Sequence, residues 1–230
     1  MAGKLYGVSV GPGDPELLTL KAVRVIREAD CIAAPNIGHG RQTALQIVWD
    51  YIEGKELIDC STPMVKDHDQ VDLEYAKIAD RLCSILDQGK NVAFITIGDA
   101  TVYSTYIYIH NKVLDRGYEA EIVPGVTSFC AAAAKLNISL CQGSESLLVV
   151  PVLKGDVDST LDFPANKVLM KSGSSIKELQ QLLDEHGQLD RASMVANCGL
   201  PDEEVYENFA DMEEPTGYFS TVIVKMEDAE

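Results

Sequence analysis

The chain has 230 residues, a net charge of −17, and 46% hydrophobic and 24% charged residues. This length accommodates one large or two modest domains, and the composition is that of a globular protein. The negative charge disfavours nucleic acids and anionic membranes as partners, because both carry negative charge themselves. No apolar stretch is long enough to span a bilayer, and the first residues lack the apolar run of a secretory signal, so we expect a cytoplasmic protein.

The cysteines lie mostly in apolar, periodic segments, and none forms a Cys-x-x-Cys pair. This usage predicts reduced, mostly buried thiols, and we assign no metal site to them. The six are Cys31, Cys60, Cys83, Cys130, Cys141 and Cys198.

The first half of the chain alternates apolar strands with amphipathic helices. A helix is expected directly after Asp14, because aspartate is a favoured N-cap and Pro15 fits the first helical position. Such alternation predicts an α/β fold with a mostly parallel sheet. The expected strands are 4–10, 31–34 and 91–97, and the expected helices are 15–26, 43–52, 71–86 and 102–114.

The second half reads as α/β with more antiparallel pairing, and thus a mixed sheet. A short strand before the Pro124-Gly125 break marks the boundary, which we set between domains 1–120 and 121–230. The acidic residues 202–204 are expected to be solvated surface. The expected helices are 128–136 and 175–186, and the expected strands are 147–150, 167–170, 193–196 and 218–226.

Three loops follow apolar strands, and α/β proteins bind ligands at the carboxyl edge of the sheet. The first does not match a dinucleotide fingerprint, because Glu16 occupies the third glycine position and the second strand ends without a carboxylate. Taken alone, it indicates only a strand-to-helix turn. The loops are Gly11-Pro-Gly-Asp14, Gly98-Asp-Ala-Thr101 and Pro124-Gly-Val-Thr-Ser128.

Taken together, the three loops and the lead-in from Val10 to Ala22 resemble the tetrapyrrole (corrin/porphyrin) methylase family. The resemblance covers nearly the whole chain and is strongest up to about Leu140. Four segments, one of which extends the third loop, resemble the branch that methylates precorrin-2 or cobalt-factor II at C20. They are Thr62-Pro-Met64, Tyr103-Ser-Thr-Tyr-Ile-Tyr108, Pro124-Gly-Val-Thr-Ser-Phe129 and Asn197-Cys-Gly-Leu-Pro-Asp-Glu203.

This resemblance implies a two-domain homodimeric methyltransferase that binds S-adenosylmethionine (SAM) between its domains, with the tetrapyrrole on the N-terminal side. Gly98 permits close backbone approach, and Asp99 offers an anion to a ligand that carries two cationic groups. Thr127 and Ser128 also fit an ordinary helix N-cap, and Met170 also fits a core position. The implied SAM contacts are Pro12, Gly98, Asp99, Thr101, Tyr103, Thr127, Ser128, Met170, Asn197, Cys198, Gly199, Tyr218 and Thr221.

The chain departs from the family pattern at one loop position. The family usually has Gly-Asp-Pro in the second loop, and Ala100 stands in place of the proline. The change removes a fixed φ, so we expect a less rigid loop with its function retained.

The implied substrate is a polycarboxylate, which a few local cations can hold despite the acidic surface. The substrate candidates are His39, Arg41, Lys66 and Tyr103, although a loop cation such as Lys66 also fits plain solvation. Methyl transfer needs mainly alignment and exclusion of water, so no catalytic base is assigned.

Four alternatives stay open at the sequence level. Two lie within the family: methylation at another ring position, and methylation of a modified protein histidine, as in diphthine synthase. The others are a non-catalytic tetrapyrrole carrier and a nucleotide-binding α/β regulator, which would bind ATP or NAD without preferring S-adenosylhomocysteine.

Overall fold

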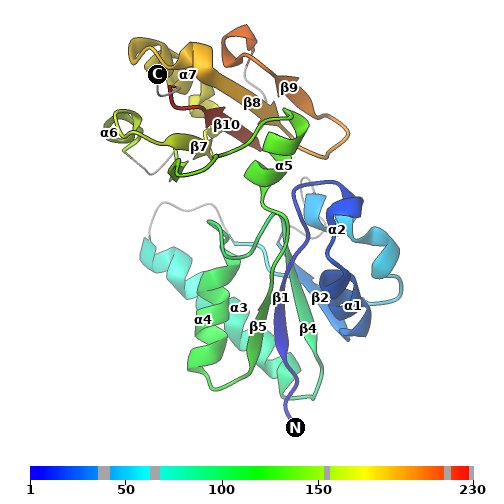
Figure 1. Ribbon diagram of the computed structural model, residues 1–230. Coiled ribbons are helices and arrows are strands. Elements are labelled where there is room, and N and C mark those ends of the chain that lie inside the picture. Colours follow the sequence, from blue (N-terminus) through cyan, green and yellow to red (C-terminus); the bar gives the residue numbers. More distant parts are fainter. Residues whose placement is uncertain (36–41, 63–67, 153–155, 215–218, 228–230) are drawn as a thin grey trace. The chain divides into compact units, whose positions relative to one another are not determined.

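The structure is a computed structural model that describes residues 1–35, 42–62, 68–152, 156–214 and 219–227 (Figure 1). The chain divides into two compact units, Met1–Thr127 and Ser128–Glu230, which we call unit 1 and unit 2. A boundary after residue 120 would cut the strand Ala120–Val123, which pairs with Leu5–Ser9, whereas the contacts divide the chain after Thr127.

The described residues of unit 1 form a sheet of five strands, all parallel, in the order β3-β2-β4-β1-β5. The expected parallel α/β sheet is therefore confirmed. The three inner strands are almost wholly buried, as is typical of parallel sheets covered on both faces. The strands are β1 (Leu5–Ser9), β2 (Cys31–Ala34), β3 (Glu56–Asp59), β4 (Val92–Thr96) and β5 (Ala120–Val123).

Helices cover both faces of this sheet and divide its core into two hydrophobic clusters. One cluster joins α3 and α4 to one face, around Leu82 and Tyr106, and the other joins α1 and α2 to the opposite face, around Ile26 and Leu45. Figure 1 shows the two helix pairs on either side of the strands. The helices are α1 (Leu20–Glu28), α2 (Thr43–Ile47), α3 (His68–Leu86) and α4 (Tyr106–Asp115).

The helix expected directly after Asp14 begins later than predicted. Asp14 caps only a 3-10 turn, Pro15–Leu17, by accepting the Glu16 N–H at 2.8 Å. The backbone is then extended, and α1 begins at Leu20, where the hydroxyl of Thr19 accepts the Ala22 N–H at 3.1 Å. Two good N-cap residues therefore stand in series, and the second one starts the α-helix.

Two other details of unit 1 also differ from the prediction. The helix α4 begins at Tyr106 and not at 102, because Tyr103 adopts a left-handed backbone conformation with φ of 49°. Strand β3 was missed, because it lies at the sheet edge and only Ile58 of its four residues is buried. An edge strand with so little burial carries no clear apolar alternation.

Unit 2 contains a mixed sheet in the order β6-β7-β10-β8-β9. Among the strands that the structure describes here, only β6 and β7 pair in parallel, and the other neighbours are antiparallel, as predicted. The strands are β6 (Leu147–Pro151), β7 (Asn166–Met170), β8 (Ala192–Ala196), β9 (Glu204–Tyr206) and β10 (Ser220–Val224). The helices are α5 (Ser128–Lys135), α6 (Val157–Leu161) and α7 (Ile176–Glu185); α6 and β9 were not predicted.

All six cysteines are free thiols in the structure. Four are buried, as expected, but Cys130 and Cys141 are exposed. Among the described residues, no helix is long and apolar enough to cross a membrane, and no cluster of three or more His, Cys, Asp or Glu side chains forms a candidate metal site.

Candidate functional site

The carboxyl ends of β4, β1 and β5 meet at one edge of the unit 1 sheet and bring the three predicted loops together. Gly11 donates its N–H to the Gly98 carbonyl at 3.2 Å, and Gly98 donates to the Gly11 carbonyl at 2.7 Å. Both residues have positive φ, 75° and 70°, which glycine adopts without steric cost. We call residues 9–12, 98–101 and 124–127 the three-loop cluster.

The side chain of Asp99 joins the second loop to the third. One carboxylate oxygen accepts the N–H and the hydroxyl of Thr101 at 2.8 and 2.5 Å, and the other accepts the Gly125 N–H at 2.8 Å. Burial alone would raise the pKa of Asp99, which is only 7% exposed, but these hydrogen bonds outweigh it and hold the pKa below its ordinary value. The carboxylate is therefore ionised at neutral pH, and its charge is already held by protein donors.

Ser9 and Gly125 complete the cluster, and no local sequence pattern indicates either role. The fully buried Ser9 hydroxyl accepts the N–H of Ala100 at 2.9 Å. A Cβ on Gly125 would lie 2.6 Å from the Ser9 Cβ and 3.1 Å from the Gly98 carbonyl oxygen, so only glycine fits there. Ala100 is itself fully buried, so the expected loosening of this loop is offset by a hydrogen bond that a proline could not make.

The other predicted unit 1 residues lie on the same loops. Pro12 is buried in the first loop, and Thr101 is exposed in the second. A Cβ on Gly98 would meet no atom within 4 Å, so its backbone faces open space. Tyr103 is 41% exposed in its left-handed conformation, and the next residue is held by a 3.0 Å hydroxyl contact between Ser104 and Thr96.

The predicted residues of unit 2 also meet at one sheet edge. Met170, at the end of β7, is paired with Thr221 in β10. On the other side of β10, Asn197 follows β8 and donates its N–H to the Phe219 carbonyl at 2.8 Å. The antiparallel pairing thus sets the start of β10 between the ends of β7 and β8.

Two acidic residues shape the turn that follows β8. Asn197 is left-handed, with φ of 51°, and its amide donates to the Asp202 carboxylate at 3.1 Å. Glu203 accepts the Gly199 N–H at 2.6 Å and pairs with Lys135 of α5 at 2.8 Å. The acidic run was expected to be plain solvated surface, but the Glu203 side chain is only 19% exposed.

The charge of Glu203 is stabilised by these contacts. Burial would raise its pKa, whereas the bonds from Lys135, Gly199 and the Cys198 thiol lower it below the ordinary value. Glu203 is therefore ionised at neutral pH, and it links the turn Cys198-Gly199 to the last residue of α5.

Some buried polar atoms at these edges have no hydrogen-bond partner among the described residues. They include Thr127 Oγ1 in unit 1, and Ser172 Oγ and Asn197 Oδ1 in unit 2. A buried polar atom left unsatisfied costs about 1–3 kcal/mol, so these atoms are suited to a polar ligand. A ligand with amino, carboxylate and nucleoside groups, such as SAM, offers matching donors and acceptors, and the residues present fit it.

Some predicted residues fall outside the described part of the chain, and the structure does not test them. They are His39, Arg41, Lys66 and Tyr218.

The described lysine and arginine side chains whose contacts are resolved already have partners within the protein. Examples are Lys112 with Asp72, Arg116 with Asp80, and Lys55 with two backbone carbonyls. A polycarboxylate would therefore compete with internal partners at most described cations.

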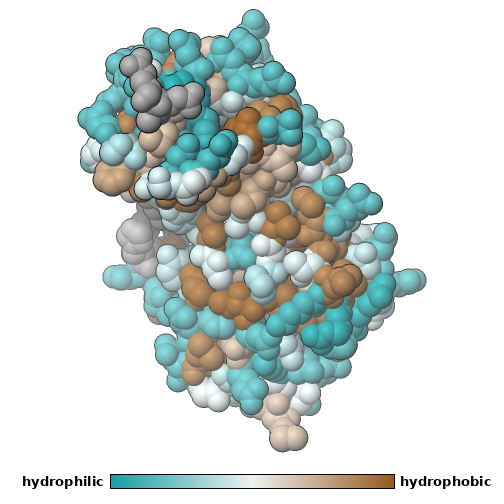
Figure 2. Space-filling view, in the orientation of Figure 1, coloured by the Kyte–Doolittle hydropathy of each residue, from teal (hydrophilic) through white to brown (hydrophobic). Residues whose placement is uncertain are grey.

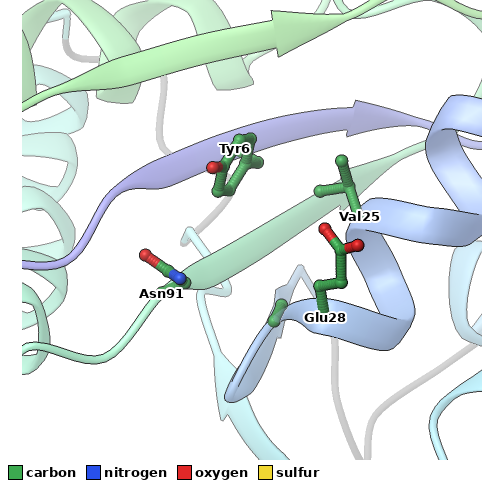
Figure 3. A pocket seen from close by; sticks show the side chains of 5 residues that line it. Tyr6, Val25, Glu28 and Asn91 are labelled. Atoms are coloured by element: carbon green, nitrogen blue, oxygen red, sulfur yellow. The ribbon is translucent and has the colours of Figure 1, made fainter.

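One small pocket lined by described residues lies away from the predicted loops (Figure 3). Its walls are Tyr6 at the start of β1, Asn91 just before β4, and Val25, Glu28 and Ala29 at the end of α1. It therefore lies toward the amino ends of the strands, and its volume of about 30 Å³ holds little more than water.

The fold and the strand-end loops define an α/β protein of two units, each with polar groups and glycine turns at one edge of its sheet. Residues 4–212 match the model of the Tetrapyrrole (Corrin/Porphyrin) Methylases. The chain belongs to this family, and the resemblance seen in the sequence is confirmed.

Two relatives match almost the full length of the chain. A cobalt-precorrin-2 C(20)-methyltransferase of Salmonella typhimurium is 35% identical over 97% of both chains. A probable cobalt-precorrin-2 C(20)-methyltransferase of Methanocaldococcus jannaschii is 34% identical over 96% of both chains.

Solved structures of the family share the fold. A cobalt precorrin-4 methyltransferase aligns with a TM-score of 0.73 at 21% identity, covering 96% of this chain and 94% of that one. The uroporphyrin-III C-methyl transferase of Thermus thermophilus, in complex with S-adenosylhomocysteine, aligns with a TM-score of 0.72 at 22% identity over 97% of both chains.

Proposed function

We propose that this chain transfers the methyl group of SAM to C20 of precorrin-2 or cobalt-factor II in cobalamin biosynthesis. The observation that carries the proposal is the near full-length match, at 35% and 34% identity, to two relatives whose names give this one position on the ring. A more distant relative named for position C11 matches only 64% of the chain at 28% identity, which favours C20.

In unit 1, the three-loop cluster would hold the methionine part of SAM. The open face of Gly98 admits a ligand to the backbone, and the ionised Asp99 favours the ligand's ammonium and sulfonium charges nearby. Because the Asp99 oxygens already accept three protein hydrogen bonds, its contribution is charge and loop shape. Thr127 Oγ1 offers a polar atom without a partner among the described residues, and Pro12 and Thr101 complete this side. Ser128, the first residue of unit 2, follows Thr127 directly and is proposed as a further contact.

In unit 2, the edge formed by β7, β10 and β8 would hold the adenosine part. Asn197 Oδ1 is a buried acceptor suited to an amino or hydroxyl donor. Met170 supplies an apolar surface, and the turn at Cys198 and Gly199 supplies backbone groups. Thr221 and Tyr218 remain weaker members of this proposed set.

SAM brings a methyl group on a cationic sulfur, and the chain has to align it with the nucleophilic ring carbon and exclude water. For the tetrapyrrole, we propose Tyr103, His39, Arg41 and Lys66 as contacts. The exposed ring of Tyr103 offers a flat apolar surface, and the three cations would meet the peripheral carboxylates.

The test is incubation of the purified chain with SAM and either metal-free precorrin-2 or cobalt-factor II. Mass spectrometry of the product should show a gain of one methyl, and NMR with a ¹³C-labelled methyl donor should place it at C20. A methyl found at another ring position would overturn the C20 specificity and assign the chain to that position. Binding of the macrocycle without labelling would overturn the enzyme assignment in favour of a carrier, and labelling of a protein histidine would favour the diphthine synthase activity.

We further propose a cytoplasmic homodimer, following the family resemblance and the composition. Hydrophobic patches interrupt the hydrophilic surface in Figure 2, and Leu20 and Trp49 of unit 1 are 90% and 64% exposed. Light scattering coupled to size exclusion should give twice the chain mass of 25.0 kDa, and a monomer mass would overturn the dimer.

A further inference from the structure

We propose that Ser9 is a positioning residue that holds the turn after β4 in the shape that binds SAM. The inference rests on the proposed function, and it concerns a side chain that does not itself meet the ligand. In this chain the Ser9 hydroxyl restrains the turn by accepting the N–H of Ala100. A proline at position 100 would restrain the same turn by fixing φ.

The contact is buried and specific. The Ser9 hydroxyl and Ala100 are both fully buried, and the Ala100 N–H points to Ser9 Oγ at 2.9 Å. The bond joins the last residue of β1 to the loop after β4. A buried N–H that loses its only partner destabilises the conformation in which it is buried.

The turn around Ala100 has the geometry in which proline is normally favoured. Val102 donates its N–H to the Asp99 carbonyl at 3.2 Å, so Asp99 to Val102 form a four-residue turn with Ala100 at its second position. Proline is favoured at that position because its ring presets φ. The Asp99 side chain holds Thr101, the third residue of the turn, by two hydrogen bonds. The backbone of Ala100 is therefore the remaining point of freedom in the turn.

With the Ser9 hydroxyl in its present position, a proline at position 100 does not fit. The ring carbon of a proline would stand about 1.5 Å from the nitrogen, roughly where the Ala100 hydrogen lies now. It would therefore enter the 2.9 Å space between this nitrogen and Ser9 Oγ. An alanine at position 9 removes the oxygen and makes room for the ring.

The restraint matters for binding because the same turn carries Gly98 and Asp99. If the Ala100 N–H is released, the loop samples other shapes, and the apparent Kd rises by the reciprocal of the binding-competent fraction. A residue that served stability alone would leave the affinity of the folded protein unchanged.

The experiment compares four full-length proteins: the unchanged chain, Ser9→Ala, Ala100→Pro, and the double variant. Calorimetry measures the Kd for S-adenosylhomocysteine, urea unfolding measures stability, and kinetics measure KM for SAM and for the tetrapyrrole. Each single variant should bind about tenfold more weakly, as expected for roughly one buried hydrogen bond. The double variant should recover to within about threefold of the unchanged chain, and KM for the tetrapyrrole should change least.

The matched control is Thr160→Ala, which removes the half-buried α6 hydroxyl that donates to the Val157 carbonyl at 2.6 Å. It should lower stability without changing the Kd. Unchanged affinity in Ser9→Ala, or a double variant as weak as Ala100→Pro, would overturn the positioning role. Absence of S-adenosylhomocysteine binding by the unchanged chain would instead overturn the proposed function, and with it this inference.

Discussion

At the scale of single residues, the three-loop cluster depends on a close approach that only glycine permits. Gly125→Ala should lower the free energy of unfolding by about 1–3 kcal/mol, the usual cost of overpacking a closed site. It should also weaken S-adenosylhomocysteine binding, because the new Cβ pushes against Ser9 and against the Gly98 carbonyl. Urea unfolding and calorimetry on the same samples measure the two effects.

Gly117 provides the control for that substitution. Its φ is +84°, but a Cβ there would meet no atom within 4 Å, so Gly117→Ala strains the backbone without a clash. Both variants should lose stability, and only the one at Gly125 should lose affinity. Equal Kd values for the two variants would show that the close packing at Gly125 serves the fold alone.

His110 makes unfolding sensitive to pH. Its ring accepts or donates a 3.0 Å hydrogen bond with the Tyr106 hydroxyl, and burial lowers the pKa of the imidazole below 6.5. The folded state therefore binds the proton less readily than the unfolded state. The contribution of His110 to stability is complete above pH 6.5 and is lost as the pH falls below 6.5 through the lowered folded-state pKa.

Urea unfolding of the unchanged chain and of His110→Gln between pH 7.5 and 5.5 isolates this effect. The unchanged chain should lose more stability than the variant on acidification. The comparison is needed because His186 acts in the opposite direction: its hydrogen bond to Asp158 raises the pKa of the ring, so its contribution grows on acidification. Parallel pH profiles would contradict the role given to His110.

At the scale of elements, Glu203 stabilises the turn after β8 by accepting the Gly199 N–H and pairing with Lys135 of α5. Glu203→Ala removes the acceptor of the Gly199 N–H and the partner of Lys135 and should weaken S-adenosylhomocysteine binding about tenfold. Glu203→Gln keeps an acceptor oxygen, so its Kd should lie between those of the unchanged chain and Glu203→Ala. The matched control is Glu204→Ala in β9, whose side chain bonds the exposed Tyr206 hydroxyl. A Kd equal to that of this control would show that the turn does not need Glu203.

The elements that sequence patterns predicted best are the buried ones. β1 and β4 are continuous apolar runs, and the structure places both within one or two residues of the expected bounds. β9, with only three residues, and α6 were missed, because short or exposed elements carry little periodicity. Helix starts were displaced wherever a second cap or a left-handed residue competed, as at Thr19 and Tyr103.

In the candidate site, too, residues with a local sequence pattern were predicted and residues without one were missed. Glycine-bearing strand ends can be recognised along the chain, so Gly11, Gly98 and the third loop were found. The partners of those loops could not be found in this way. Ser9 bonds a residue 91 positions away, and no local pattern marks such a contact.

At the scale of the whole molecule, the acidic charge requires the substrate's carboxylates to be met locally. If Arg41 and Lys66 meet them, Arg41→Gln and Lys66→Gln should each raise KM for the tetrapyrrole several-fold, with a smaller effect at high salt, and should leave KM for SAM unchanged. Steady-state kinetics at two salt concentrations measure this. The control is Lys77→Gln, whose partner Glu74 lies one turn earlier on α3. An unchanged KM in both variants would show that groups other than Arg41 and Lys66 contact the carboxylates.

The order of strands in unit 2 has a consequence for how the chain is made. β10 lies at the centre of its sheet, between β7 and β8, yet it follows every other strand in sequence. Unit 1 is complete at Thr127 and has all its strands available early in translation. Until residues 220–224 leave the ribosome, β7 and β8 each keep an unpaired edge, and such edges favour aggregation. Nascent chains stalled before residue 220 should therefore carry a folded first half and a second half that recruits chaperones.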